Sequence, residues 1–211
     1  MEIKLKNLIK LFIILVSFLL FTILSFNVLS ANNLVNLKQV YKLLNEKRFD
    51  DAISGLEVLS NKNRINAQYL FSQILFSGNI VPQNFEKAYF WSNVSNLGGF
   101  KKSQKIIKLI DNYLDEKQKI EINNDIKTFL EKLSMKKNKL AIIQIAKWHL
   151  ELSEEIDYIN AYKWYNVAVA IGIKSAAKRR DEIIDELSAE EIFDAQKKSN
   201  NIFKKINKLG G

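Results

Sequence analysis

The sequence predicts an all-α fold, built from a repeated helical unit that follows an N-terminal signal segment. The chain of 211 residues is 47% hydrophobic yet has one Pro and seven Gly, which favours helices over many strands and turns. Its apolar residues recur at helical spacing. The stretch Ala88-Tyr89-x-Trp91 also reappears later in the chain as Ala161-Tyr162-x-Trp164, which indicates a repeated structural unit.

The first element, residues 1–31, has the order of a secretory signal. Three lysines precede an uncharged apolar run from Leu11 to Phe26, and small residues follow it. The run is of borderline length for a spanning helix, so removal by signal peptidase and retention as an N-terminal anchor both stay open. Either outcome places the body outside the cytoplasm, as a periplasmic or extracellular protein or one anchored at the inner membrane.

Residues 33–66 are expected to form the first helical pair. Asn63 stands where a helix needs a left-handed terminator, a conformation that Asn tolerates better than most residues. The expected apolar positions are Tyr41, Leu44, Phe49, Ala52, Leu56 and Leu59.

Two copies of a longer unit follow, residues 67–133 and 141–207. After an internal loop, equivalent residues of the two copies are separated by one constant number of residues. Before that loop the separation is longer by one residue. The second copy therefore lacks one loop residue. Each copy also has the spacing of a capping box, at Asp115 with Gln118 and at Ser188 with Glu191. The basic stretch of residues 131–139 is expected to connect the copies.

Both copies resemble the Sel-like repeat, a relative of the tetratricopeptide repeat, in its exported bacterial type. The first copy matches the repeat at Ala67, Phe71, Gly78, Val81, Pro82, Lys87, Ala88, Trp91 and Gly99. The second matches at Ala141, Asp157, Ala161, Trp164, Ala168 and Gly172, without the loop glycines. Residues 174–203 are similar to an extension that often follows such repeats, and residues 33–66 form a tetratricopeptide-like pair.

The resemblance implies an α-solenoid of antiparallel helix pairs. Such an array has a concave groove, built from the first helix of each pair, that holds a peptide or protein. Side chains of this groove are equally expected as plain surface or as packing for an adjoining helix. Tetratricopeptide geometry assigns to it Tyr69, Gln73, Phe76, Ile143, Lys147 and Glu151.

No catalytic, metal or cofactor site is predicted. The chain has no Cys and one histidine, His149, for which a packing or groove-lining role is expected; its neighbour Trp148 is a candidate to line the groove. Two S-x-x-K patterns, at Ser134 and Ser175, lack the companion motifs of penicillin-recognising enzymes. Adjacent glutamates such as Glu190 and Glu191 point apart on a helix and suit its first turn instead.

The chain is basic, with a net charge of +9, and about +7 remains without residues 1–31. Because the lysines alternate with acids, solvation of helix surfaces explains most of them, while contact with anionic envelope surfaces stays open. Export makes nucleic acid an unexpected partner.

These features predict a non-catalytic protein–protein interaction module of the cell envelope, a scaffold or adaptor that holds a peptide or protein of unknown identity. A cell-wall-associated enzyme or a peptidoglycan-binding factor is the alternative. An anchored structural protein is a third class, and it depends on whether the signal segment is retained.

Overall fold

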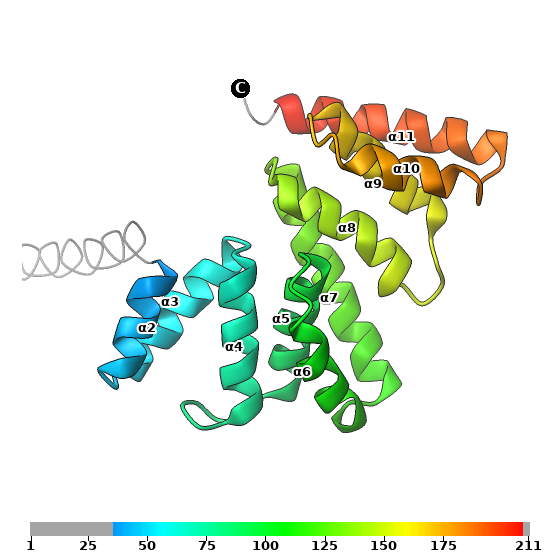
Figure 1. The fold of residues 1–211 in the computed structure, drawn as a ribbon. Coiled ribbons are helices and arrows are strands. Elements are labelled where there is room, and N and C mark those ends of the chain that lie inside the picture. The colour runs from blue at the N-terminus through cyan, green and yellow to red at the C-terminus, as the bar shows by residue number, and fades with distance from the viewer. Residues whose placement is uncertain (1–35, 209–211) are drawn as a thin grey trace, which may run out of the picture. The chain divides into compact units, whose positions relative to one another are not determined.

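A computed structural model describes residues 36–208, and the predicted signal segment lies outside them. These residues are all-helical, with antiparallel helix pairs as predicted and no strand. No helix among them is both long and apolar enough to span a membrane. The elements are α2 (Leu37–Asn45), α3 (Phe49–Asn61), α4 (Ile65–Ser77), α5 (Phe85–Leu97), α6 (Ser103–Ile110), the 3-10 turn η1 (Asp111–Tyr113), α7 (Glu116–Met135), α8 (Lys139–Glu151), α9 (Tyr158–Ala170), α10 (Ala176–Ile184) and α11 (Ala189–Lys208) (Figure 1).

The chain divides into two compact units, the first ending at Val58 and the second beginning at Leu59. In the first unit, Asn36 caps α2 by accepting a hydrogen bond from the Gln39 amide at 2.9 Å. The buried side chains of α2 are Val40 and Leu43. The predictions that Tyr41 and Phe49 face the core were wrong, since their side chains are 49% and 37% exposed. In α2 the helical phase was misjudged by one residue, because the predicted core residues Tyr41 and Leu44 directly follow the buried Val40 and Leu43.

The second unit contains two four-helix copies, α4–α7 and α8–α11. Their helices begin at matching places: α9, α10 and α11 follow α5, α6 and α7 at one constant offset, and α8 follows α4 at an offset longer by one. The offsets found in the sequence therefore recur in the helix bounds. Residues 131–139 are mostly helical, however, because α7 continues to Met135 and leaves only a three-residue turn before α8.

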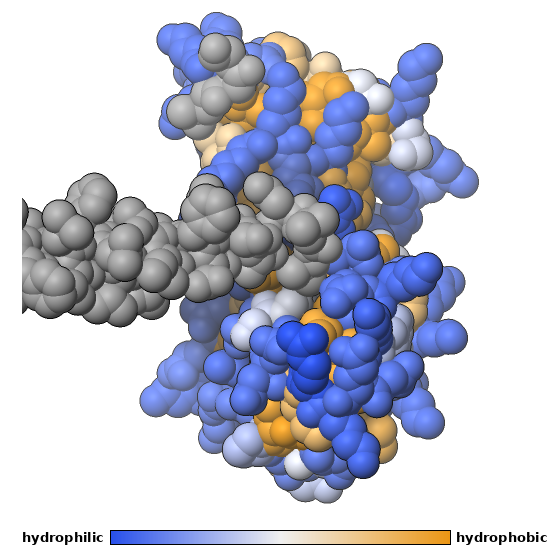
Figure 2. All heavy atoms as spheres, turned by 90° about the vertical axis from the view of Figure 1, so that its left-hand side faces the viewer, coloured by the Kyte–Doolittle hydropathy of each residue, from blue (hydrophilic) through white to orange (hydrophobic). Residues whose placement is uncertain are grey.

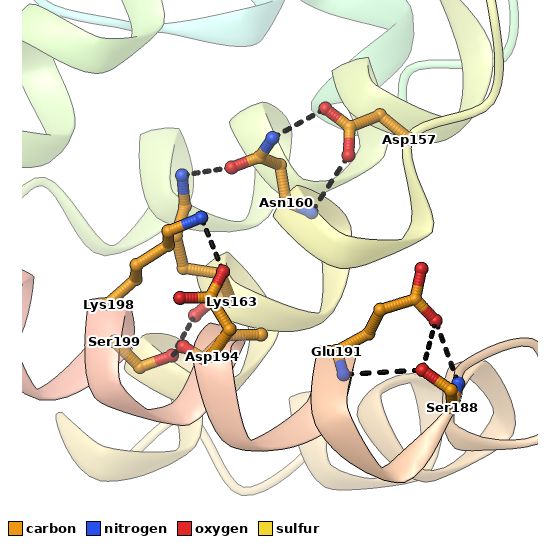
Figure 3. Close-up of polar contacts among 9 residues, drawn as sticks. Asp157, Asn160, Lys163, Ser188, Glu191, Asp194, Lys198 and Ser199 are labelled. Atoms are coloured by element: carbon orange, nitrogen blue, oxygen red, sulfur yellow. Dashed lines mark hydrogen bonds and ion pairs between the residues drawn. The ribbon is translucent and has the colours of Figure 1, made fainter.

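The internal loops of the two copies close in the same way. The Asn84 amide donates to the Leu75 carbonyl at 2.9 Å, and the equivalent Asp157 amide donates to His149, also at 2.9 Å. Asn84 and Asp157 then cap α5 and α9. Figure 3 shows Asp157 in this role, with its carboxylate bound to both the backbone and the side chain of Asn160. The second loop thus forms without the glycines of the first.

Both predicted capping boxes are confirmed. The Asp115 carboxylate accepts from the Gln118 amide at 2.8 Å, and the Gln118 side chain accepts from the Asp115 amide at 3.0 Å. In the second copy, the Glu191 carboxylate accepts from the Ser188 amide at 2.8 Å (Figure 3). Asn63 also has the predicted left-handed conformation, with φ of 59°. These local interactions define where the helices start and stop.

The residues assigned to repeat packing lie in the core or at helix ends. Seven of them are buried side chains: Ala67, Phe71, Ala88, Trp91, Ala141, Ala161 and Trp164. Three are glycines with positive φ at the ends of helices: Gly78, Gly99 and Gly172. Trp91, 8% exposed, lies between helices, with its ring centroid 5.5 Å from that of Phe129 on α7 and 6.1 Å from that of Phe71 on α4. On the face shown in Figure 2, hydrophilic side chains cover most of the surface.

A buried chain of amide side chains joins the two copies. Asn63, in the turn before α4, donates to the Gln144 side chain of α8 at 2.6 Å and accepts from Gln68 of α4 at 3.0 Å. Gln144 in turn donates to the Val94 carbonyl of α5 at 2.8 Å. Gln68 and Gln144 are fully buried, so water does not compete for these hydrogen bonds.

The Trp91→Ala substitution is expected to lower the free energy of unfolding by roughly 3–5 kcal/mol, because it leaves a cavity among Phe71, Phe90 and Phe129. Urea unfolding followed by far-UV circular dichroism measures the change. Ile156→Ala is the control, since that side chain is largely exposed. An unchanged unfolding midpoint would show that Trp91 is not a packing residue.

Replacing Gln144 with Met keeps the side-chain length but removes both hydrogen-bonding groups. The Asn63 amide and the Val94 carbonyl then lose their buried partner, which is expected to cost about 1–3 kcal/mol of unfolding free energy. Gln104→Met, at an exposed position of the same unit, is the control in the same urea titration. Equal midpoints for the two variants would contradict a stabilising role of the amide chain.

Candidate functional site

A cleft of about 410 Å³ opens between α4 and α6. Its apolar part is formed by Ile74 and Phe76 of α4 and by Ile106 and Leu109 of α6. Leu109 is 46% exposed, so part of its apolar surface is available inside the cleft. The remaining lining residues are Tyr69, Gln73, Ser77 and Lys105.

The end of α5 lies close to the start of α4, and α6 begins shortly after this point. A Cβ atom at Gly98, the residue after α5, would lie only 2.3 Å from Cγ2 of Ile65, so glycine allows the end of α5 to approach the start of α4. Gly99 then turns the chain with φ of 96°. After this turn, the Phe100 ring contacts the Tyr69 ring at a centroid distance of 4.7 Å. The cleft therefore has one wall stabilised by an aromatic contact.

Four lysines lie beside the cleft, on the side of Tyr69, and we call them the lysine rim: Lys101, Lys102, Lys105 and Lys108. With Tyr69 and Gln104 they line an adjoining depression of about 490 Å³. No Asp or Glu occurs from residue 87 to residue 110. Within residues 36–208, none of the four side chains has an ion pair or hydrogen bond. Their positive charge is therefore available to a ligand.

The second copy differs at the same positions. Arg179 and Glu182 occupy the places of Ile106 and Leu109, and their side chains form an ion pair at 2.8 Å. An apolar surface has thus been replaced by a satisfied charged one. The α4–α6 cleft is a feature of the first copy rather than of the repeat.

The structure brings together three of the six side chains assigned to the groove. Tyr69, Gln73 and Phe76 line the α4–α6 cleft, one turn or two apart on α4. Ile143 and Lys147 lie on α8 and are half-buried; the Lys147 ammonium donates to the Leu97 carbonyl at 3.1 Å. They do not line this cleft.

Glu151, the sixth, lines a separate cavity of about 470 Å³ that also contains Tyr89, Lys119 and Asn123. Burial raises the pKa of Glu151, although Lys147 and Arg179 oppose this effect. In the same cavity, hydrogen bonds to the carboxylates of Asp111 and Glu116 raise the pKa of Lys119 well above its ordinary value. The cation is thus already neutralised by two carboxylates, so this cavity is a weaker candidate for a charged ligand.

His149 is a core residue rather than a surface one. Only 2% of its side chain is exposed, and its Nδ1 lies 3.1 Å from an Asp157 carboxylate oxygen without forming a directed hydrogen bond. Burial lowers the pKa of His149 to about 4, because it disfavours the charged ring more than Asp157 favours it. The imidazole is therefore neutral at physiological pH.

The expectation that Trp148 lines the groove was wrong. Its indole is buried, and its Nε1 donates to the Asn123 carbonyl of α7 at 2.8 Å. Within residues 36–208, no group of three or more His, Cys, Asp and Glu side chains could hold a metal ion. The α4–α6 cleft with its lysine rim is thus the strongest candidate site in the part of the chain described.

The α6 side of the cleft was missed from the sequence. Tetratricopeptide geometry assigns groove residues only to the first helix of each pair, whereas Lys105, Ile106 and Leu109 belong to the third helix of the first copy. The signal that could have found them is the acid-free stretch from residue 87 to residue 110, because lysines without nearby acids are available to an anionic partner.

A scan against protein-family models found no matching model, and a search of curated proteins found no match. Among solved structures, the chain matches a protective antigen present in uropathogenic Escherichia coli strains, which displays an SLR fold. The two chains are 16% identical, with a TM-score of 0.37, and the match covers 74% of this chain and 41% of the antigen. The chain thus spans about two-fifths of the length of that protein.

Acidification is expected to destabilise the fold through His149. Its pKa is lowered from 6.5 to about 4, so the unfolded chain binds a proton more readily between these values, and the contribution present above pH 6.5 is lost as pH falls. The free energy of unfolding should fall by up to ~3 kcal/mol across this window. Asp157, whose pKa is also lowered, adds a loss at lower pH.

Urea unfolding of the native chain and of His149→Gln at several pH values measures this effect. The variant lacks the titrating ring, so its stability should change less between pH 6.5 and 4. Parallel stability profiles for the two proteins would show that His149 does not cause the acid sensitivity.

Proposed function

We propose that this chain is a non-catalytic protein–protein interaction module of the cell envelope. Its ligand is an acidic segment with apolar side chains, which binds in the α4–α6 cleft of the first copy. The observation that carries this proposal is the combination of two accessible apolar side chains in the cleft, the exposed Leu109 and the half-buried Phe76, with four lysines that have no partner among residues 36–208.

The apolar part of the cleft provides the affinity. Leu109 and the partly exposed Phe76 would leave water when a ligand side chain enters, and burial of an apolar side chain contributes roughly 1.5–3 kcal/mol. Exposed apolar groups in a concave surface are typical of sites that bind protein segments. An aliphatic or aromatic anchor is therefore the expected centre of the ligand.

The lysine rim provides selection by charge. Exposed ion pairs add little stability individually, but a concentrated positive field accelerates encounter with acidic partners and disfavours basic ones. Gln73, on the opposite wall, can hydrogen-bond the backbone of an extended or helical ligand. The cleft would thus distinguish acidic apolar segments from neutral ones.

The fold suits such a role, because stacked helix pairs present extended surfaces for partner proteins. Export is part of the proposal and is supported by the order of charges and apolar residues in residues 1–31. N-terminal sequencing of the purified protein distinguishes cleavage from anchoring, since an intact Met1 contradicts cleavage.

A photo-crosslinking amino acid in place of Gln73 tests the proposal in cells that express the full chain. The expected product is a crosslink to a protein segment that is rich in Asp and Glu and contains large apolar residues, identified by mass spectrometry. Combining the crosslinker with Lys105→Glu and Lys108→Glu should reduce the yield by about tenfold or more, because like charges then face each other.

The matched control is the same crosslinker at Asn200, an exposed residue of α11 outside the cleft. Equal yields at the two positions would indicate random encounter and contradict a binding cleft. Crosslinks only to lipid would indicate an anionic surface as the true target. Crosslinks only to peptidoglycan would overturn the proposal in favour of a cell-wall-binding role.

A further inference from the structure

An acidic corner lies where α10 meets α11, and we define it as residues 181–194. It contains seven Asp and Glu residues and no Lys or Arg. Four of these acids have local partners: Asp181, Glu182, Glu191 and Asp194. Figure 3 shows two of them, Glu191 bound to Ser188 and Asp194 bound to Lys198. Asp185, Glu186 and Glu190 have no partner within the described residues.

An exposed aromatic ring accompanies these free carboxylates. Phe193 is 71% exposed, and it lies three residues after Glu190, on the same face of α11. Leu187, in the connection before α11, is also partly exposed. The Ser188–Glu191 capping box fixes the start of α11, so the charge and the ring are held in place before any partner arrives.

The acidic corner complements the α4–α6 cleft in both charge and apolarity. The corner has three free carboxylates and the cleft has four free lysines; the corner also exposes the Phe193 ring, and the cleft exposes the apolar side chain of Leu109. None of the residues that line the cleft or the adjoining depression comes from α10 or α11. A chain therefore does not fill its own cleft with its own corner.

We propose that the acidic corner of a second copy of this chain occupies the α4–α6 cleft, with Phe193 on the apolar part of the cleft and Asp185, Glu186 and Glu190 against the lysine rim. This inference rests on the proposed function, because it names the partner of the same cleft. A single contact would then cover both the acidic corner with its exposed Phe193 and the α4–α6 cleft with its lysine rim.

Such a contact is heterologous, because two different surfaces of the molecule meet. Each copy that docks leaves one cleft and one corner open, so the assembly grows head to tail instead of stopping at two. The contact is small, and its charged part is screened by salt. Association should therefore increase with protein concentration and decrease with ionic strength.

Two variants test the contact by sedimentation velocity, with the chain expressed from Met1 and purified as the cell processes it. The cleft variant carries Lys101→Ala, Lys105→Ala and Lys108→Ala, and the corner variant carries Glu186→Gln, Glu190→Gln and Phe193→Ser. The native chain should form species larger than a dimer. Each variant alone should need at least about tenfold higher concentration to associate.

Mixing the variants identifies the two surfaces. The corner variant retains an intact cleft and the cleft variant retains an intact corner, so an equimolar mixture should form a dimer that does not grow further. All substituted positions are exposed, and thermal unfolding of each variant verifies that it is folded. A native chain that stays monomeric at every accessible concentration overturns the proposal, as does a mixture that associates no better than either variant.

Failure of self-association is separable from failure of the proposed function. If the native chain is monomeric but the Gln73 crosslinker captures an acidic segment of another protein, the cleft is a binding site for a different partner. If neither result appears, both proposals are wrong. A crosslink from Gln73 to residues 181–194 of this chain would support both.

Discussion

The buried amide chain of Asn63, Gln68 and Gln144 is the constraint on which the arrangement of the second unit depends. A fully buried amide is costly unless it is hydrogen-bonded, so Gln144 requires both the Asn63 side chain and the Val94 carbonyl. These partners come from the turn before α4 and from α5, whereas Gln144 itself belongs to α8. The second copy is thus held against the first in one register. Apolar packing alone tolerates shifts that such directed bonds do not.

This constraint determines which face of α4 is left for a ligand. Gln68 and Phe71 face the interior, so Tyr69, Gln73 and Phe76 are directed away from it, where α6 forms the second wall. The end of α5 approaches the start of α4 closely because residue 98 is glycine. The cleft is therefore a consequence of buried packing on the opposite side of α4, and its shape does not require a ligand to form.

The sequence predicts those features that are local or periodic. Helix starts with capping boxes, the left-handed Asn63 and the offset between copies all depend on nearby residues or on repetition. The roles of Gln68 and Gln144 could not be predicted from repetition, because neither residue is repeated. Ile142 occupies the place of Gln68 in the second copy, and Leu70 occupies the place of Gln144 in the first. The sequence also could not predict that Glu151 and Tyr69 line different cavities, because this depends on how one copy packs on the other. The phase of α2 was misjudged for a third reason: Tyr41 and Leu44, which can both pack in a core, directly follow the buried Val40 and Leu43.

The net charge of +9 conceals a separation of charge between the two copies. The third helix of the first copy has lysines without acids, whereas the acidic corner, which begins within the third helix of the second copy, has acids without lysines. The helix bounds of the copies correspond, so the backbone does not impose this difference; the side chains do. Two copies of one scaffold thereby acquired opposite charges on surfaces that do not meet within a molecule. Attraction between such surfaces can act only between molecules, and in the proposed contact it would oppose the repulsion between the net positive charges of two copies.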